Sequence, residues 1–373
     1  MENNILTYLK WRHDLSFKQS SFNDIDALIL ARFSYMDLND IINKPITIHD
    51  AYLEYVKTIS KRQIYWELDP KLFELMANSI RFKDLLLSNY VNIQNKEVVE
   101  QFSCVSIHLN ELRQIYISFR GTDNTLVGWK EDFAMTFEDT ISSHFTAADY
   151  IEKIMKANPY KKIILGGHSK GGHLAIAGPT VLKKDRYLNR ILKIYSFDGP
   201  GLSNKMLEYP NYAKIIPLIT TFIPQSSIIG KMLGHKENIK IVKAEAFGPY
   251  QHDIYSWEID NTNFIYLNET TIPSDIIDSA FENYVNNLSC EDRKKVVEAM
   301  FEILEASGSL TLKDMKKDFF SNAYKMFEKS RKLDDNSKDL IMKAIKVLSS
   351  SFTQETKEIL NKYFEQNKIN QQS

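Results

Sequence analysis

The chain has 373 residues, of which 43% are hydrophobic and 25% are charged, as in an ordinary globular protein. These proportions exclude a disordered or a fibrous protein. Lysine and arginine together number 47 and aspartate and glutamate 48, so the net charge of −1 gives no electrostatic reason to expect a nucleic-acid partner. The length suits two or three average domains, or one large α/β domain with additions.

The cysteines and the first residues bear on the compartment. Cys104 and Cys290 lie far apart and outside any CxxC or Cys/His metal-ligand spacing, so the sequence gives no disulfide framework. Charged residues come too early for a signal peptide, and no window reaches the roughly 18 apolar residues of a membrane span. We therefore expect a cytoplasmic protein without a transmembrane segment. The sequence does not indicate its oligomeric state.

Residues 1–100 are expected to form a mainly helical segment that packs on the core. Apolar residues recur at helical spacing in Ile25–Phe33 and in Leu72–Ala77. Asn23 or Asp24 is a suitable N-cap for the first of these helices.

Residues 101–268 have the pattern of an α/β core. Short runs rich in β-branched and aromatic residues predict strands at 105–109, 115–119, 162–165, 193–197, 218–223 and 239–242. Helical stretches at 147–157 and 173–182 separate several of them. Strands that alternate with helices predict βαβ units and a mainly parallel central sheet.

Residues 269–373 return to a helical pattern. Ser289 is the expected N-cap of a helix whose apolar stripe ends near Gly308. Further helices are predicted to begin near Thr311 and from about 336 and 354, before a polar tail. These helical additions either cover the sheet or form a lid, and their periodicity does not decide between the two.

The run Gly167-His168-Ser169-Lys170-Gly171 fits the pattern G-x-S-x-G directly between a predicted strand and a predicted helix. This context is that of a nucleophile elbow, where the serine sits on a strained turn and its neighbours must be small. The backbone N–H of Lys170 would then face a developing oxyanion. A glycine-rich phosphate loop is the alternative, but neither G-x-G-x-x-G nor G-x-x-x-x-G-K-[ST] fits these glycines.

A second signal precedes the elbow. The strand that ends in Phe119-Arg120-Gly121-Thr122 would place the Thr122 N–H and hydroxyl beside Ser169 and complete an oxyanion hole. The alternative is a strand that ends in a turn with a salt-bridged Arg120, and composition alone favours this alternative.

Together these runs resemble known sequences. Phe119–Thr122 with Trp129 and Asp132, followed by Gly167–Gly172, resembles the paired signature of the class 3, or fungal-type, lipases. More closely, the chain resembles a bacterial Mbeg-like family of lipase-like α/β hydrolases. The shared runs are Tyr8–Leu15, Val127–Phe133, Ser196–Gly201, Ile223–Ile228 and Gln251–Asp253. The resemblance implies an α/β-hydrolase fold, a triad and carboxylic ester substrates, but no particular acyl donor. The helical patterns before and after the core make the N- and C-terminal segments helical additions to this fold.

The catalytic base is expected at His252. In α/β hydrolases the chain order is serine, acid, histidine, and His252 lies in a loop after the last clear strand, where the resemblance also puts the base. His235 is the reserve. His173 lies four residues after Ser169 on the same predicted helix and is carried away from the serine oxygen.

The catalytic acid is expected at Asp198. Class 3 lipases carry this acid in a segment that corresponds to residues 218–230 here, but no Asp or Glu occurs between Asn211 and His235. Asp198 follows a predicted strand, and the carboxyl ends of parallel strands converge on one edge. Its alternative role is that of a turn residue. Asp253 adjoins the candidate base, and we expect its side chain to point elsewhere.

Two functions stay open. The first is a serine hydrolase for an acyl ester, in which Ser169 is the nucleophile, His252 the base, Asp198 the acid, and Lys170 and Thr122 the oxyanion donors, with no metal or organic cofactor. The Lys170 side chain would lie at the mouth of this site, where it either favours anionic substrates or is simply solvated. The second is a non-catalytic module that binds a ligand or a partner. The elbow, oxyanion and histidine signals favour the hydrolase.

Overall fold

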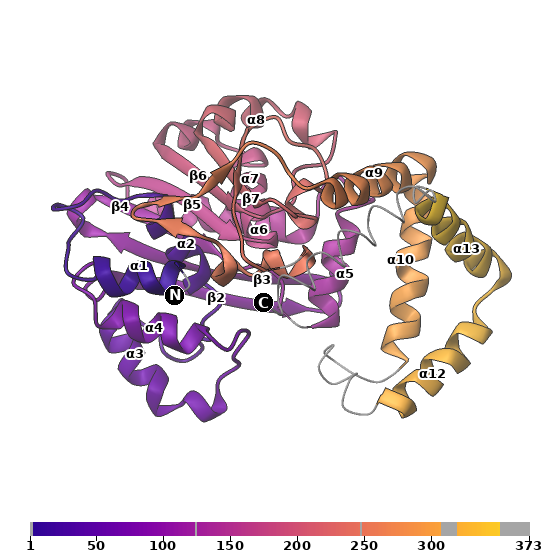
Figure 1. Cartoon of the computed structure of the whole chain (residues 1–373), viewed down its shortest axis with the longest axis horizontal. Coiled ribbons are helices and arrows are strands. Elements are labelled where there is room, and N and C mark those ends of the chain that lie inside the picture. The colour runs from indigo at the N-terminus through magenta and orange to yellow at the C-terminus, as the bar shows by residue number, and fades with distance from the viewer. Residues whose placement is uncertain (1–2, 124, 247, 307–318, 351–373) are drawn as a thin grey trace, which may run out of the picture.

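The computed structural model describes residues 3–123, 125–246, 248–306 and 319–350. A nine-stranded sheet in the order β1-β2-β3-β4-β5-β6-β7-β8-β11 forms its centre (Figure 1). Its strands are β1 (Ile46–Thr47), β2 (Leu86–Asn95), β3 (Glu100–Leu109), β4 (Gln114–Phe119), β5 (Lys162–His168), β6 (Ile191–Phe197), β7 (Ile219–Pro224), β8 (Asn238–Val242) and β11 (Tyr266–Leu267). A separate small sheet pairs β9 (Ile259–Asp260) with β10 (Asn263–Phe264).

The sheet is parallel in its middle and antiparallel at its edges. Strands β4 to β8 run parallel to one another, while β1 to β3 and β11 are added antiparallel. All six predicted core strands are present. In the register, Phe119 pairs with Gly167 and Gly167 with Ser196. The three strands β4, β5 and β6 therefore end at the same edge of the sheet, and their next residues lie together.

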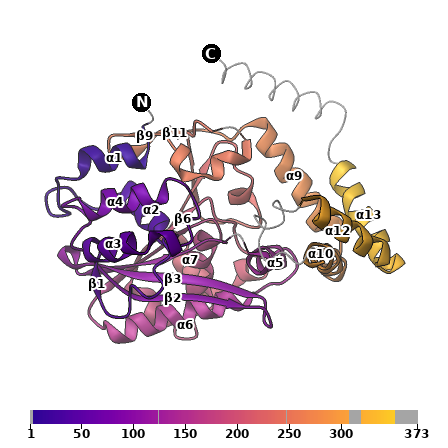
Figure 2. The same ribbon diagram turned by 90° about the horizontal axis from the view of Figure 1, so that it is seen from below.

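Helices cover both faces of the sheet (Figure 2). The first group is α1 (Ile5–Arg12), α2 (Asp24–Phe33), α3 (Ile48–Lys57) and α4 (Asp69–Ala77), and the second is α6 (Ser142–Ala157), α7 (Lys170–Thr180) and α8 (Pro210–Ile215). Strand β4 shows the two-sided burial, because Ile115, Ile117 and Phe119 pack into one apolar cluster and Tyr116 into the other. These features give the α/β-hydrolase fold, with a mainly parallel centre and helical additions.

The N-terminal segment contains helices at both places where the sequence predicts them, and it ends in a strand. Asn23 caps α2 by accepting from Ile25 N–H and Asp26 N–H, and the Asp26 carboxylate accepts in return from Asn23 N–H. Residues 86–95, however, form β2 and pair with β3. The period-2 pattern of this strand is broken by an irregularity between Ser88 and Val91, so the sequence does not show a strand there.

The C-terminal helices are α9 (Ile272–Asn287), α10 (Cys290–Glu305), α12 (Phe319–Lys332) and α13 (Asp335–Ser350). Ser289 caps α10 as predicted, since its side chain accepts from Asp292 N–H. The predicted helices near Thr311 and 354, the stripe end near Gly308 and the polar tail lie outside the described residues. None of the helices in the described ranges is both long and apolar enough to cross a bilayer.

Candidate active site

Ser169 lies between β5 and α7 in a strained conformation. Its φ of 59° and ψ of −133° are rarely adopted by a residue with a side chain. The backbones around it are crowded: a Cβ on Gly171 would lie 2.1 Å from the Phe119 carbonyl oxygen, and one on Gly167 would lie 2.3 Å from the Gly171 carbonyl carbon. Only glycine fits at these two positions, as a nucleophile elbow requires.

His252 and Asp198 are brought together from positions 54 residues apart. Asp198 directly follows β6 with a φ of 49° and is buried. His252 ends a 3-10 helix, Gly248–His252, and its Nδ1 lies 2.6 Å from Asp198 Oδ2. A carboxylate in this position accepts from Nδ1–H, which leaves Nε2 of a neutral imidazole as the acceptor. The arrangement can hold a histidine in the tautomer that a general base needs.

Residues 218–230, where the resemblance to class 3 lipases would put the acid, contact Asp198. Ser227 Oγ donates to Asp198 Oδ1 at 2.5 Å, and Gly230 N–H donates to the same oxygen at 3.1 Å. These two donors satisfy one oxygen of the buried carboxylate and leave the other for His252. The sequence gives no sign of this role for Ser227 beyond its position in residues 218–230.

The residue before Ser169 lies against the candidate base. His168 Nε2 is 2.8 Å from the His252 carbonyl oxygen, and the two imidazole rings are 4.5 Å apart between centroids. His168 Nδ1 is 3.1 Å from the Tyr35 hydroxyl. Burial lowers the pKa of His168 well below its ordinary value, so a neutral ring donates to His252 and accepts from Tyr35. His168 and Tyr35 were missed, although His168 stands inside the serine motif.

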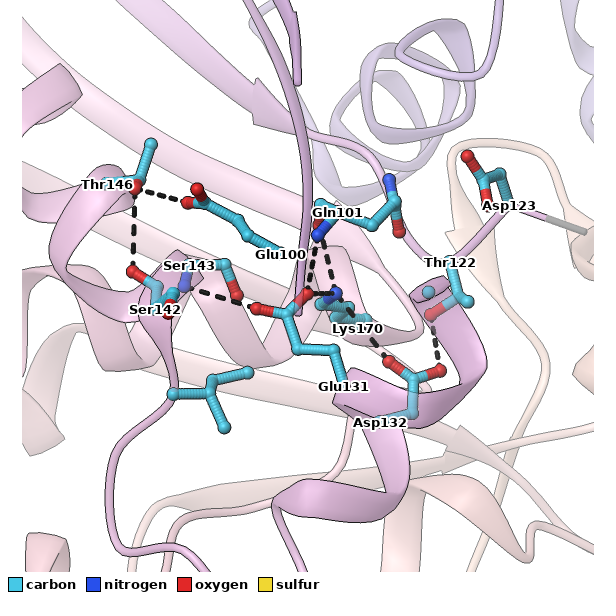
Figure 3. Close-up of polar contacts among 12 residues, drawn as sticks. Glu100, Gln101, Thr122, Asp123, Glu131, Asp132, Ser142, Ser143, Thr146 and Lys170 are labelled. Carbon is cyan, nitrogen blue, oxygen red and sulfur yellow. Dashed lines mark hydrogen bonds and ion pairs between the residues drawn. The ribbon is translucent and has the colours of Figure 1, made fainter. Parts of the chain in front are cut away.

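Thr122 lies three residues after the end of β4, in a loop that reaches the elbow. A Cβ on the preceding Gly121 would be 3.1 Å from Ser169 Cβ, so this loop touches the candidate nucleophile. The Thr122 hydroxyl donates to Asp132 Oδ2 at 2.5 Å (Figure 3). Burial raises the pKa of Asp132 to about 6. The salt bridge of Arg120, which the alternative interpretation of this turn predicted, is also present, because Arg120 Nη2 lies 3.5 Å from Asp123 Oδ2.

The prediction that the Lys170 side chain lies at the mouth of the site or in solvent is wrong. Its side chain is 1% exposed and forms an ion pair with Glu131. Nζ also donates to the Gln101 carbonyl oxygen at 2.9 Å and lies 3.8 Å from Asp132 Oδ1. Two carboxylates of α5 (Leu126–Ala134) and a carbonyl oxygen at the start of β3 thus replace water around the ammonium.

His173, His235 and Asp253 each contact a residue other than Ser169 or His252. His173 is buried, with its Nε2 2.7 Å from His144 Nε2. His235 Nδ1 lies 2.7 Å from Glu237 Oε1. Asp253 accepts from Tyr255 N–H at 3.1 Å, so its side chain points away from His252 as expected.

The sequence matches a known family over most of its α/β core. A sequence model described as Mbeg1-like matches residues 76–302, which is more than half of the chain. The chain belongs to the Mbeg1-like family. Comparison with curated proteins gave no match.

This Mbeg1-like chain is also similar to solved lipase structures. The Lip2 lipase of Yarrowia lipolytica is 11% identical, with a TM-score of 0.31 over 46% of this chain and 69% of the lipase. The lipase of Rhizopus microsporus var. chinensis is 14% identical, with a TM-score of 0.34 over 58% of this chain and 83% of the lipase. Lipase II of Rhizopus niveus is 14% identical, with a TM-score of 0.35 over 52% and 76%.

Proposed function

We propose that this Mbeg1-like protein is a serine hydrolase that cleaves a carboxylic ester through an acyl-enzyme. Ser169 Oγ attacks the ester carbonyl carbon while His252 Nε2 takes its proton, and Asp198 holds the resulting imidazolium. The backbone N–H groups of Lys170 and Thr122 donate to the oxyanion. His252 then returns the proton to the leaving alcohol, and water releases the acyl group by the same steps.

The contact between His252 and Asp198 carries this proposal. A histidine in a loop after β8 and a buried carboxylate at the end of β6 have no structural need to meet, yet their side chains lie 2.6 Å apart. They do so at the sheet edge where β5 delivers Ser169 in its strained turn. Strain of this kind costs stability and gathers at functional sites, which supports a catalytic role for Ser169 beside the pair.

Labelling with a fluorophosphonate tests the proposal, because this reagent reacts with an activated serine. We expect the full-length wild type to be labelled at Ser169, as mapped on its peptides, and the Ser169→Ala variant to stay unlabelled. A folded wild type that takes no label would overturn the proposal in favour of a binding module.

A matched pair of histidine variants identifies the base. His252→Gln should slow labelling by at least 10²-fold, since a general base contributes about 10² to 10⁴. His235→Gln removes the other candidate and should leave the labelling rate unchanged. The reverse pattern would assign the base to His235.

A further inference from the structure

A buried ammonium group next to the nucleophile is an unusual feature of this site. Lys170 is the first residue of α7 and directly follows Ser169, yet its side chain is almost entirely buried. A buried charge is costly unless a counter-ion and hydrogen bonds replace its water, and an apolar side chain of similar length would avoid the cost. The cost of burying this ammonium suggests that its charge has a role at the site.

Glu131 of α5, the counter-ion, connects α5 with α7, β3 and α6. Besides the Lys170 ammonium, its Oε2 accepts from Gln101 N–H at 2.9 Å in β3. Its Oε1 accepts from Ser143 N–H at 3.2 Å, at the N-terminus of α6 (Figure 3). The carboxylate is itself 1% exposed. The ion pair thus fixes α5 against the first turn of α7.

Asp132, the next residue of α5, connects Lys170 with Thr122, the second proposed oxyanion donor. Asp132 Oδ1 lies 3.8 Å from Lys170 Nζ, and its Oδ2 accepts from the Thr122 hydroxyl at 2.5 Å. Figure 3 shows the row formed by Glu131, Lys170, Asp132 and Thr122. Lys170 is therefore connected to both donors, since one is its own N–H and the other belongs to the threonine that Asp132 holds.

We propose that the Lys170 side chain is a positioning residue, which sets the spacing between the Lys170 and Thr122 N–H groups through α5. The inference rests on the proposed function and deepens it. Loss of an oxyanion donor costs about 10² to 10³ in kcat, because the donors must already point at the place where charge develops. A side chain that fixes their separation therefore acts on the rate without touching the substrate.

A double-mutant cycle on the full chain tests this coupling. The second-order rate constant for fluorophosphonate labelling of Ser169 is measured for the wild type, Lys170→Met, Thr122→Val and the double variant. If Lys170 acts through Asp132 and Thr122, Lys170→Met slows labelling at least tenfold in the wild type and less than threefold in the Thr122→Val background. Equal slowing in both backgrounds, or no slowing, would overturn the inference.

Two further variants separate positioning from folding. Lys170→Met together with Glu131→Gln removes both charges, leaves no unpaired carboxylate beside Gln101, and should slow labelling as much as Lys170→Met alone. Full labelling speed in this folded double variant would overturn the inference. Asp26→Asn removes one charge from the buried pair with Arg81 in the N-terminal helices. It should lower the melting temperature and leave the labelling rate within twofold of wild type.

The outcomes also separate this inference from the proposed function. A wild type that is labelled at Ser169, with additive effects of Lys170→Met and Thr122→Val, would overturn the role of Lys170 alone. A folded wild type without label would overturn the proposed function and this inference with it.

Discussion

Asp198 is the residue on which the proposed triad differs from that of the class 3 lipases. It lies one residue after β6, and Ser227 and Gly230 from the lipase-type acid segment donate to its carboxylate. The candidate carboxylate thus lies at the end of β6, and its hydrogen bonds come from the segment after β7.

Replacing this carboxylate gives the sharpest prediction for a single residue. We expect Asp198→Asn to lower kcat for p-nitrophenyl butyrate by about 10⁴, the loss seen when a protease triad loses the charge of its acid. Asp253→Asn is the matched control, since it changes the aspartate next to His252 but keeps the cap on Tyr255 N–H. Equal kcat values for Asp198→Asn and wild type would remove Asp198 from the mechanism.

The buried histidine pair behind the elbow gives a prediction for pH. Burial lowers the pKa of His173 to about 4, below its ordinary value of 6.5. Between these values the unfolded chain binds more protons than the folded chain, so this contribution to stability is complete above pH 6.5 and is lost as the pH falls toward 4.

Urea unfolding of a His173→Gln variant at pH 7.5 and pH 5 measures this contribution. The variant should lose less free energy of unfolding on acidification than the wild type does. His13→Gln, which changes an exposed histidine, should behave like the wild type. A His173→Gln variant with the same pH dependence as the wild type would show that His173 does not titrate as described.

At the scale of elements, α7 approaches β4 so closely that Gly171 has no room for a side chain. A Cβ on Gly171 would meet backbone atoms of Phe119 and Arg120, whereas one on Gly178 in the same helix would meet the Ile151 side chain at 3.0 Å. Backbone cannot move aside as a side-chain end can, and alanine otherwise favours a helix by about 1 kcal/mol over glycine.

Gly171→Ala should therefore lower the free energy of unfolding by roughly 2 kcal/mol or more, a loss typical of overpacking. Gly178→Ala should change it by less than about 1 kcal/mol. Thermal and urea unfolding of the two variants checks the contrast. A Gly171→Ala variant as stable as Gly178→Ala would mean that the elbow is less crowded than these distances require.

The sequence predicts the middle of this fold better than its edges. Strands β4 to β8 read as short apolar runs because both faces of a parallel sheet are buried. Strand β2 could not be predicted in this way, because polar residues and a break in register interrupt its alternation of apolar and polar residues. Ser169, His252 and Asp198 could be proposed because their types and chain order follow the known logic of the fold.

The role of the Lys170 side chain could not be predicted. Its partner Glu131 lies 39 residues away, and nothing in the local pattern separates a buried ion pair from two solvated charges. Only the folded chain brings the start of α7 to the side chain of Glu131 on α5. The contacts of Ser227 and His168 arise in the same way, from segments that meet only in the folded chain.

At the scale of the whole molecule, helix α10 of the C-terminal addition packs on α5, the helix that carries Glu131 and Asp132. Val297 and Phe301 of α10 form a buried cluster with Leu126 of α5. The Phe301 ring also lies 6.0 Å from the Phe133 ring in an edge-to-face contact. The C-terminal addition thus supports α5, and through it the candidate oxyanion site.

Truncation of Phe301 tests this support. Phe301→Ala should lower stability by about 3 to 5 kcal/mol, as core phenylalanine truncations do, and should speed amide hydrogen exchange within α5. Met300→Ala is the matched control, because Met300 is the preceding residue of α10 and is 38% exposed. Unchanged exchange of the α5 amides in Phe301→Ala would show that α10 does not support α5.

The covalent acyl-enzyme is the central claim for this protein, and trapping it is the most direct measurement. The full chain is mixed with p-nitrophenyl butyrate, quenched in acid, and examined by intact and peptide mass spectrometry. We expect one butyryl group on Ser169 of the wild type and none on Ser169→Ala, which should also lose ester hydrolysis. Hydrolysis at the wild-type rate by Ser169→Ala would contradict the acyl-enzyme.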